Sequence, residues 1–138
     1  ILVVPRIDKD TKDEPGSPNI ATAILEKIDR SQIVVSDVSI TTEKGAKRSS
    51  PNPNVLYELG YAVKSIGSDR VIMVQNLAYG GPELLPFDLK SHRITTYDCS
   101  PKTGTSSVKK KLASILEEAI RLILKKREFL PPTNWKRA

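Results

Sequence analysis

The chain has 138 residues, of which 38% are hydrophobic, a size that supports one domain with a core of its own and is short for two. No apolar run approaches the roughly 20 residues that span a bilayer, and the opening apolar run lacks the flanks of a signal peptide, so we expect a cytoplasmic protein without membrane contact. Cys99 and His92 are single, which leaves no ligand set for zinc, so we expect no protein-bound metal.

The net charge of +6 is unevenly distributed along the chain. Residues 101–138 carry a charge of +7, whereas residues 1–100 carry −1. The lysines and arginine of residues 109–111 and 125–127 flank an amphipathic segment, and we interpret them as its solvated face. Because aromatic residues that could stack on bases are not interleaved with these charges, we do not expect this domain to bind nucleic acid. Residues 1–126 form the predicted domain, and residues 127–138 a basic tail or linker.

The predicted elements alternate between strands and helices. In chain order they are a strand at 1–4, a helix at 19–30, strands at 32–37 and 70–75 on either side of a helix at 54–66, a strand at 94–97 and a helix at 107–126. Alternation of this kind predicts right-handed crossovers and a mostly parallel sheet, hence a three-layer, flavodoxin-like α/β fold. Because a strand at residue 1 normally follows an earlier strand and helix, we expect the first strand and helix of the fold to be missing.

The helix at 54–66 has a clear start. Asn52 is able to cap the free amides of the first turn, and Pro53 suits the first helical position because it has no amide to leave unpaired. Glu58 then falls in the second turn, beside an apolar stripe, and leans toward the helix start. Gly60 lowers the helix propensity by roughly 1 kcal/mol relative to alanine, which close packing or a nearby ligand would explain.

A second acid stands where the strand at 32–37 ends, at Asp37. Carboxyl ends of parallel strands and helix starts share the ligand edge of such sheets, so Asp37 and Glu58 could meet at one site, with helix amides free for phosphate. Each acid also has an ordinary explanation: Glu58 as a favourable charge near a helix start, worth about 0.3 to 1 kcal/mol, and Asp37 as a loop cap. Tyr57 and Tyr61 are equally explained by base stacking and by packing.

Several motifs resemble those of a known family. They are, in order, the segments at residues 8–12, 15–18, 37–39, 51–62 and 85–89, and they look like the prokaryotic TIR-like (Toll/interleukin-1 receptor-like) domains predicted to bind nucleotides. We interpret the last segment as a loop anchor with Phe87 buried. The core Glu58 to Ala62 is also similar to the nucleoside 2-deoxyribosyltransferases. Those enzymes carry an acid six residues before the helix glutamate, where this chain has Asn52, and a tyrosine-bearing strand that is absent here.

The TIR-like resemblance implies an effector domain of antiphage defence that cleaves the nicotinamide-ribose bond of NAD, with NAD as substrate and no other cofactor. It implies Glu58 as the catalytic carboxylate and a set of substrate-binding residues: Asp37, Ser39, Asn52, Asn54, Tyr57 and Tyr61. Self-association and a sensor module on the full-length chain are further expectations. The alternatives are a non-catalytic module for nucleotide binding or self-association, and a transferase-like enzyme that exchanges bases. Hydrolysis, cyclisation and base exchange remain open.

Overall fold

The computed structural model describes residue 7 and residues 15–16, 19–43, 45–102 and 104–128. Its longer elements are, in chain order, α1 (Ile20–Arg30), β1 (Val34–Asp37), α2 (Pro53–Ile66), β2 (Val71–Asn76), β3 (Ile94–Tyr97) and α4 (Thr105–Glu128). Shorter turns connect them: the 3-10 turns η1 (Ser68–Arg70), η2 (Leu77–Tyr79) and η3 (Pro82–Leu84), and the four-residue helix α3 (Phe87–Lys90). The strand predicted at residues 1–4 lies outside the described residues.

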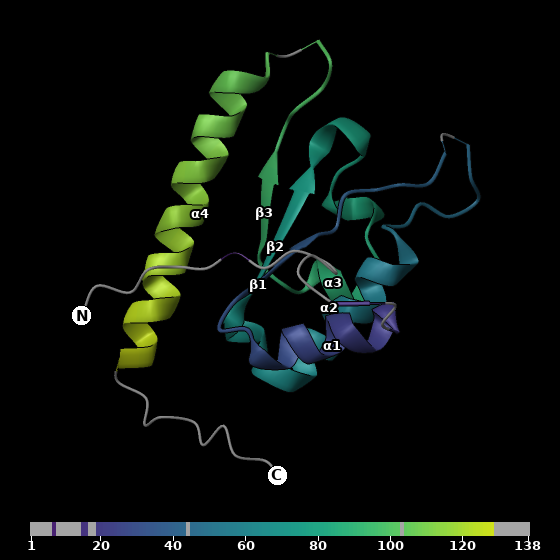
Figure 1. Cartoon of the computed structure of the whole chain (residues 1–138). Helices are drawn as coiled ribbons and strands as arrows, with labels where there is room; N and C mark the ends of the chain where they lie inside the picture. Colours follow the sequence, from purple (N-terminus) through teal and green to yellow (C-terminus); the bar gives the residue numbers. More distant parts are fainter. Residues whose placement is uncertain (1–6, 8–14, 17–18, 44, 103, 129–138) are drawn as a thin grey trace.

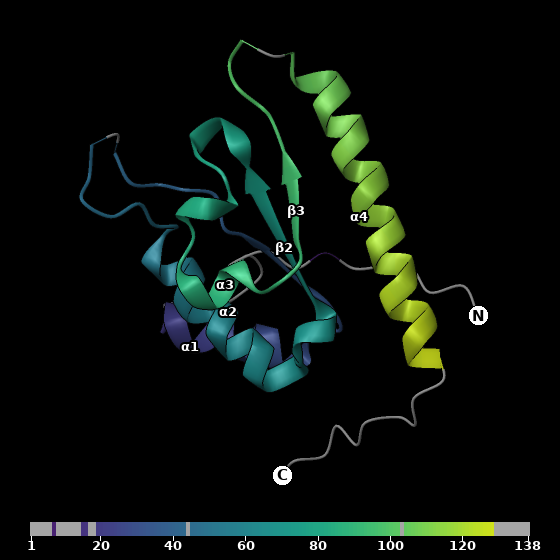
Figure 2. The ribbon, with the colours of Figure 1, turned by 180° about the vertical axis from the view of Figure 1, so that it is seen from behind.

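The three strands form one parallel sheet in the order β1-β2-β3. Helices α1 and α2 lie on one side of this sheet, and α4 lies on the other side (Figure 1). The view from behind shows the same separation (Figure 2). The chain therefore has the predicted three-layer α/β architecture, in which short strands are covered by helices on both faces.

The two faces of the sheet can be assigned from its register. Ser36 pairs with Met73, and Met73 belongs to the core cluster that contains Leu59 of α2, so these residues face α2. Because side chains alternate along a strand, Val35 and Asp37 point to the opposite face, where α4 lies. The core on the α2 side consists of Val38, Ile40, Leu59, Met73 and Leu85.

Helix α2 shows the packing predicted for it. Leu59, Ala62 and Ile66 are buried, and Val55 is half-buried, so the apolar stripe faces the sheet. Gly60 lies on the exposed side, where a Cβ atom would meet nothing within 4 Å. Close packing within the described protein is therefore not the reason for this glycine, and that part of the expectation was wrong.

Helix α4 covers its face of the sheet more loosely. Its apolar residues, Ile115 among them, are at most half-buried, and Leu122, predicted to pack on the sheet, is 57% exposed. The helix extends two residues beyond the predicted range at each end. Among the described residues, no helix combines the length and the hydrophobicity needed to cross a lipid bilayer.

The segment between β2 and β3 differs most from the prediction. It contains the short helical turns η2, η3 and α3, which have too few residues to show a helical period in the sequence. Phe87, predicted to be buried, is 86% exposed at the start of α3. Leu85 is the residue that anchors this segment, because it is buried in the core cluster. No ion pair links Asp88 to Arg93 within the part of the chain that the structure describes.

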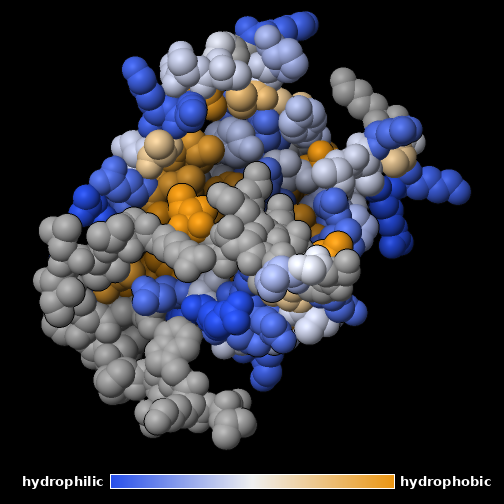
Figure 3. All heavy atoms as spheres, in the orientation of Figure 1, coloured by the Kyte–Doolittle hydropathy of each residue, from blue (hydrophilic) through white to orange (hydrophobic). Residues whose placement is uncertain are grey.

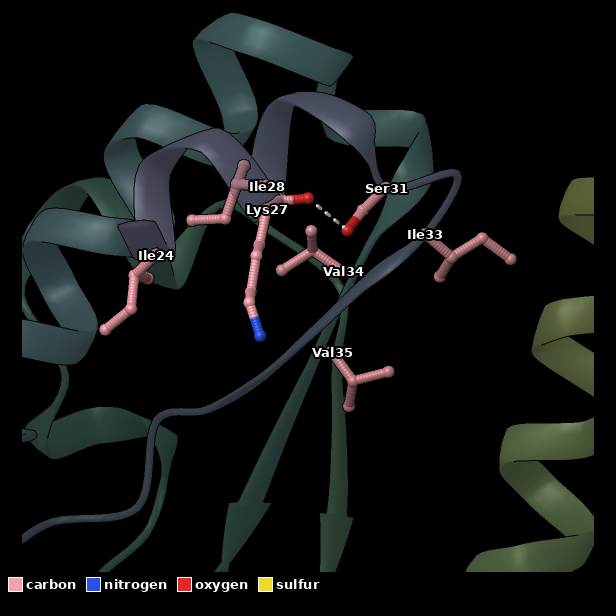
Figure 4. A pocket seen from close by; sticks show the side chains of 7 residues that line it. All are labelled: Ile24, Lys27, Ile28, Ser31, Ile33, Val34 and Val35. Atoms are coloured by element: carbon pink, nitrogen blue, oxygen red, sulfur yellow. Dashed lines mark hydrogen bonds between the residues drawn. The ribbon is translucent and has the colours of Figure 1, made fainter. Parts of the chain in front are cut away.

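Among the described residues β1 is an edge strand of the sheet, and its free side borders a hollow of about 140 Å³. Its walls come from α1 and from β1 with the residues just before it; the lining residues are Ile24, Lys27, Ile28, Ser31, Ile33, Val34 and Val35. Figure 4 shows Val34 turned toward α1 and Val35 turned toward the α4 side. Figure 3, which is seen from the same side as Figure 1, shows hydrophobic surface near the middle of the molecule. The hollow lies beside the amino half of β1, away from the strand ends where the candidate site is built.

Candidate functional site

Helix α2 begins where the sequence predicts. The side-chain oxygen of Asn52 accepts a hydrogen bond from the Asn54 amide at 2.9 Å, and the Asn52 carbonyl accepts from the Leu56 amide at 3.1 Å. Pro53 is the first helical residue. The cap and the proline together fix the first turn of the helix, and hence the position of the residues in its second turn.

The start of α2 is held beside the end of β1. Ile40 and Pro51 form an antiparallel bridge, and the Thr41 amide donates to the Ser50 carbonyl at 3.0 Å. These contacts close the loop 41–50 at its base, so the chain leaves β1, makes an excursion and returns to the same place. The first turn of α2 consequently lies at the carboxyl edge of the sheet, the edge at which open parallel sheets bind ligands.

Glu58 lies in the second turn of α2 and is half-buried. It is three residues before Tyr61 and seven before Ser65, spacings that place all three on one side of the helix. Tyr61 donates to Asp29 of α1 at 2.8 Å, and Ser65 donates to the same carboxylate. This side of α2 therefore faces α1, and Glu58 occupies its part nearest the carboxyl edge.

The two tyrosines of α2 have different surroundings. Tyr57 is 63% exposed, which leaves its ring open to a ligand. The hydroxyl of Tyr61 reaches Asp29, near the end of α1 and close to the amino edge of the sheet. This hydrogen bond raises the pKa of Tyr61 above its usual value of 10.0, with smaller contributions from burial and from the charge of Asp29. Substrate binding by either residue stays a prediction.

The first turn of α2 has fewer free amides than a typical helix start. Pro53 has no amide, and the amide of Asn54 is occupied by the cap. The amide of Leu56 donates to Asn52, which leaves Val55 as the first-turn amide without an acceptor among the described residues. A phosphate at this place would depend on the exposed side chains of Asn52 and Asn54 as much as on the backbone.

A second polar group occupies the ends of the strands. One carboxylate oxygen of Asp37, Oδ1, accepts from the Ser39 hydroxyl at 2.5 Å and from the Ser39 amide at 3.0 Å. The Ser39 hydroxyl in turn accepts from the amide of Asn76, the last residue of β2, at 2.8 Å. The ends of β1 and β2 are thus joined through a side chain that uses both its donor and an acceptor position.

Asn76 extends this network to β3. Its carboxamide pairs with the backbone of Cys99 at two points, donating to the carbonyl at 2.9 Å and accepting from the amide at 3.0 Å. It also accepts from the Ala78 amide at 3.1 Å and is only 6% exposed. The sequence analysis missed this residue. The signal that could have found it is its position at the end of a buried strand that neighbours Asp37.

Tyr97, the last residue of β3, completes the row of strand ends and was also missed. It is half-buried, and burial raises the pKa of its phenol above 10.0; the charge of Asp37 raises this pKa further, while a hydrogen bond with Ser39 lowers it. Tyr79 contributes a weaker effect in the same direction and is 60% exposed. The phenol therefore lies close to Asp37 and Ser39 and stays protonated at neutral pH.

Asp37 and Glu58 lie at the same edge of the sheet but on different sides of it. Asp37 points to the α4 face, whereas α2 covers the opposite face. No hydrogen bond links the two residues within the described ranges. The expectation that they share one site stays a prediction. Within the described residues no group of His, Cys, Asp and Glu is arranged to hold a metal ion.

A parallel sheet between two helical layers, with a half-buried glutamate in a helix that starts at the carboxyl edge, defines the class of this chain as a three-layer α/β domain with a ligand edge. Residues 7–99, about two thirds of the chain, match the family model described as CAP12/Pycsar effector protein, TIR domain. The chain belongs to this family. Searches of curated proteins and of solved structures each returned no match. The predicted TIR-like resemblance is therefore confirmed. The similarity to the nucleoside 2-deoxyribosyltransferases stays a prediction.

Proposed function

We propose that this TIR domain cleaves the N-glycosidic bond between nicotinamide and ribose in NAD, with Glu58 as the catalytic carboxylate. The observation that carries the proposal is the position of Glu58, half-buried in the second turn of a helix whose start is fixed at the carboxyl edge. Membership in a family of effector TIR domains supports the role of an effector, and we place that role in antiphage defence.

The chemistry requires a negative charge more than an acid. Nicotinamide leaves as a neutral molecule from a positively charged pyridinium, so the leaving group needs no proton, and positive charge develops on the ribose. A carboxylate about 4 Å from that charge contributes about 4 kcal/mol at the effective dielectric constant typical of protein surfaces. Glu58 would act by accepting hydrogen bonds from the ribose hydroxyls or by bonding briefly to the sugar carbon. Water then attacks, and the products are ADP-ribose, nicotinamide and a proton.

The remaining predicted residues supply binding. Asn52 and Asn54 offer exposed carboxamides at the start of α2, and Tyr57 offers an exposed ring. Asp37 and Ser39 offer polar groups at the end of β1. Tyr61 has the weakest support, because its hydroxyl is bonded to Asp29. NAD is the substrate in this proposal, and no further cofactor takes part.

The test is to incubate the purified domain with NAD and to measure free nicotinamide by chromatography. Glu58→Gln keeps the shape of the side chain and removes its charge, and we expect turnover to fall by roughly a hundredfold or more. Glu117→Gln is the matched control, because Glu117 is exposed on α4 and pairs only with Arg121 among the described residues. Turnover that survives in Glu58→Gln would contradict the proposal.

The same assay separates the alternatives. Tight NAD binding with no turnover in the wild-type domain would indicate a signalling module. Incorporation of an added free base into the product would indicate base exchange, and a ring-closed ADP-ribose would indicate cyclisation. Each product has its own retention time, so one chromatogram distinguishes them.

We also propose that activity depends on self-association, triggered by a sensor module on the full-length protein. If so, turnover per molecule should rise when the domain is immobilised at high density, compared with the same amount at low density. Light scattering of the free domain in solution, at a low and at a high concentration, would show whether it assembles.

A further inference from the structure

We propose that Asp37 and Tyr97 form a second hydroxyl-binding point of the nucleotide site, on the α4 side of the sheet, which holds the ribose of the half of NAD that is not cleaved. This inference rests on the proposed function, since it concerns the same nucleotide. It assigns a role to Tyr97 as a residue that determines specificity, and it separates the two acids at the carboxyl edge into two binding points.

The positions of the two residues carry the first step. Asp37 pairs with Val74, and Tyr97 pairs with Asn76, two residues further along the same strand. Val74 and Asn76 point to the same face of β2, so Asp37 and Tyr97 also share this face and flank β2 at its end. Glu58 is on the helix that covers the other face. A ligand that reaches both acids must therefore cross the ends of the strands, as an extended dinucleotide is able to do.

The carboxylate of Asp37 is fixed in place and partly available. Oδ1 accepts both hydrogen bonds from Ser39, while Oδ2 has no hydrogen-bond partner among the described residues and the residue is exposed. The Ser39 hydroxyl already donates to Asp37 and accepts from Asn76. Ser39 is thus a positioning residue, and Oδ2 of Asp37 is the group that is open to a ligand hydroxyl.

Tyr97 supplies the complementary group. A sugar hydroxyl both donates and accepts, so a site that recognises it needs an acceptor and a donor. Asp37 is the acceptor. The phenol of Tyr97 lies on the same face as Asp37 at the end of the sheet and interacts with Ser39, and it stays a protonated donor because burial and the charge of Asp37 raise its pKa. Tyr79, exposed and on the η2 turn that follows β2, offers a ring for the adjoining base.

The surrounding network keeps this arrangement rigid. Asn76 is buried and ties the segments after β2 and β3 together through Ala78 and Cys99, and its amide holds Ser39. Groups that are already oriented lose little conformational entropy when a ligand binds. The strand ends are therefore suited to recognise a hydroxyl rather than only to terminate the sheet.

The experiment measures AMP and ADP-ribose binding by calorimetry for the wild-type domain and for Asp37→Asn, Tyr97→Phe and the double variant. We expect each single change to weaken AMP binding by about tenfold, the usual effect of losing a hydrogen bond that involves a charged or buried group. The loss of AMP affinity in the double variant should be smaller than the product of the two single-variant losses, because both residues bind the same hydroxyl. Ser39→Ala should weaken binding less than Asp37→Asn. Glu117→Gln, at an exposed position of α4 that has no part in the proposed site, is the control and should bind normally.

AMP lacking the 2′-hydroxyl and AMP lacking the 3′-hydroxyl identify the group that is read. One of these two deoxy ligands should bind the wild-type domain about tenfold more weakly than AMP does. The same deoxy ligand should bind the double variant with the affinity that AMP has for that variant. Equal binding of all ligands to wild type and variants would overturn the inference, as would a wild-type domain that binds neither AMP nor ADP-ribose. Thermal melting of each variant checks folding, and Tyr97→Phe keeps the ring that packs at the end of β3.

The outcome is separable from that of the proposed reaction. If NAD is not cleaved but AMP binding depends on Asp37 and Tyr97, the reaction fails and the binding point stands. If NAD is cleaved through Glu58 while the variants keep the wild-type KM, the binding point alone fails. With both correct, Asp37→Asn and Tyr97→Phe raise KM for NAD and leave kcat close to the wild-type value, whereas Glu58→Gln lowers kcat and leaves AMP binding unchanged.

Discussion

The two faces of the sheet are covered in different ways. On the α2 side, residues of the helix, the strands and the connecting segments form a buried cluster around Leu59 and Met73. On the other side α4 lies along the sheet with its apolar residues at most half-buried, and Val35 of β1 is 49% exposed. The face that carries Glu58 is thus the well-packed one, and the position of that acid is set by the core of the domain. The strand ends on the α4 side are held by hydrogen bonds instead.

The sharpest test of this difference compares one apolar truncation on each face. Leu59→Ala should lower the free energy of unfolding by about 2 to 5 kcal/mol, because the side chain is 2% exposed and its removal leaves a cavity. Ile115→Ala on α4 removes a half-buried side chain and should cost about 1 kcal/mol. Urea denaturation measures both. Equal losses would show that α4 is packed as tightly as α2.

A glycine on the packed side gives the next largest effect. Gly80 has a φ of +139°, and a Cβ atom there would lie 2.7 Å from Leu84 Cδ1 and 3.2 Å from Ile40 Cγ1. Gly80→Ala should therefore destabilise the domain by about 1 to 3 kcal/mol. Gly60→Ala is the matched substitution in open space on α2, where the gain in helix propensity should stabilise the domain by about 1 kcal/mol. Melting temperatures that move in the same direction would contradict this account.

The cap of α2 separates stability from function. Asn52→Ala removes the acceptor for the Asn54 amide and should cost about 1 kcal/mol. Asn19→Ala removes the equivalent cap of α1, where Asn19 accepts from the Thr22 amide at 3.1 Å, and should cost a similar amount. We expect only the Asn52 variant to lower NAD turnover, because only that cap positions the helix of Glu58. Asn52→Asp should restore the stability. If both variants lost turnover in proportion to their loss of stability, the Asn52 cap would have no role in turnover beyond stabilising the domain.

The smallest effect concerns the contact between α1 and α2. The pKa of Tyr61 is raised above 10.0, first by its hydrogen bond to Asp29, so the folded state holds this proton more tightly than the unfolded state. The stabilisation is complete below the unfolded pKa and is lost as the pH rises through the folded pKa. Tyr61→Phe should flatten this part of the alkaline decline in stability, measured by urea midpoints between about pH 9 and pH 11. Tyr57→Phe, which alters an exposed tyrosine, should keep the wild-type decline.

The elements that the sequence predicts well are those defined by local chemistry. Asn52 and Pro53 specify the start of α2 through the chemistry of two adjacent residues. The apolar runs of β1 and β2 predict the ends of these buried strands to within two residues. The turns after β2 depend on packing against residues that are distant in sequence, such as Ile40, which leaves no room for a side chain at Gly80. For the same reason the sequence could not show that Leu85 is buried and Phe87 is exposed.

The sequence predicts at which edge of the sheet the candidate site lies, but not how its residues are distributed over the two faces of the sheet. The sequence places Glu58 and Asp37 at one edge, but the side of the sheet that α2 covers follows only from the packing of Leu59 against Met73. Asn76 and Tyr97 are inconspicuous in the sequence, since each is a common residue at the end of a strand. Asn76 bonds to Ser39 and Cys99, which lie 37 and 23 residues away in the sequence. Tyr97 shares its face of the sheet with Asp37 only because of the strand register.

The bridge between Ile40 and Pro51 has a practical and evolutionary consequence. Because the excursion 41–50 is pinched at its neck, its length and composition are uncoupled from the helix that follows. Relatives could therefore lengthen this loop or change its residues with little disturbance to α2. An experimenter could insert a reporter or an affinity peptide into its exposed part, around Lys47 and Arg48. The segment offers a surface on which recognition of other molecules is free to diversify while the fold beneath it stays the same.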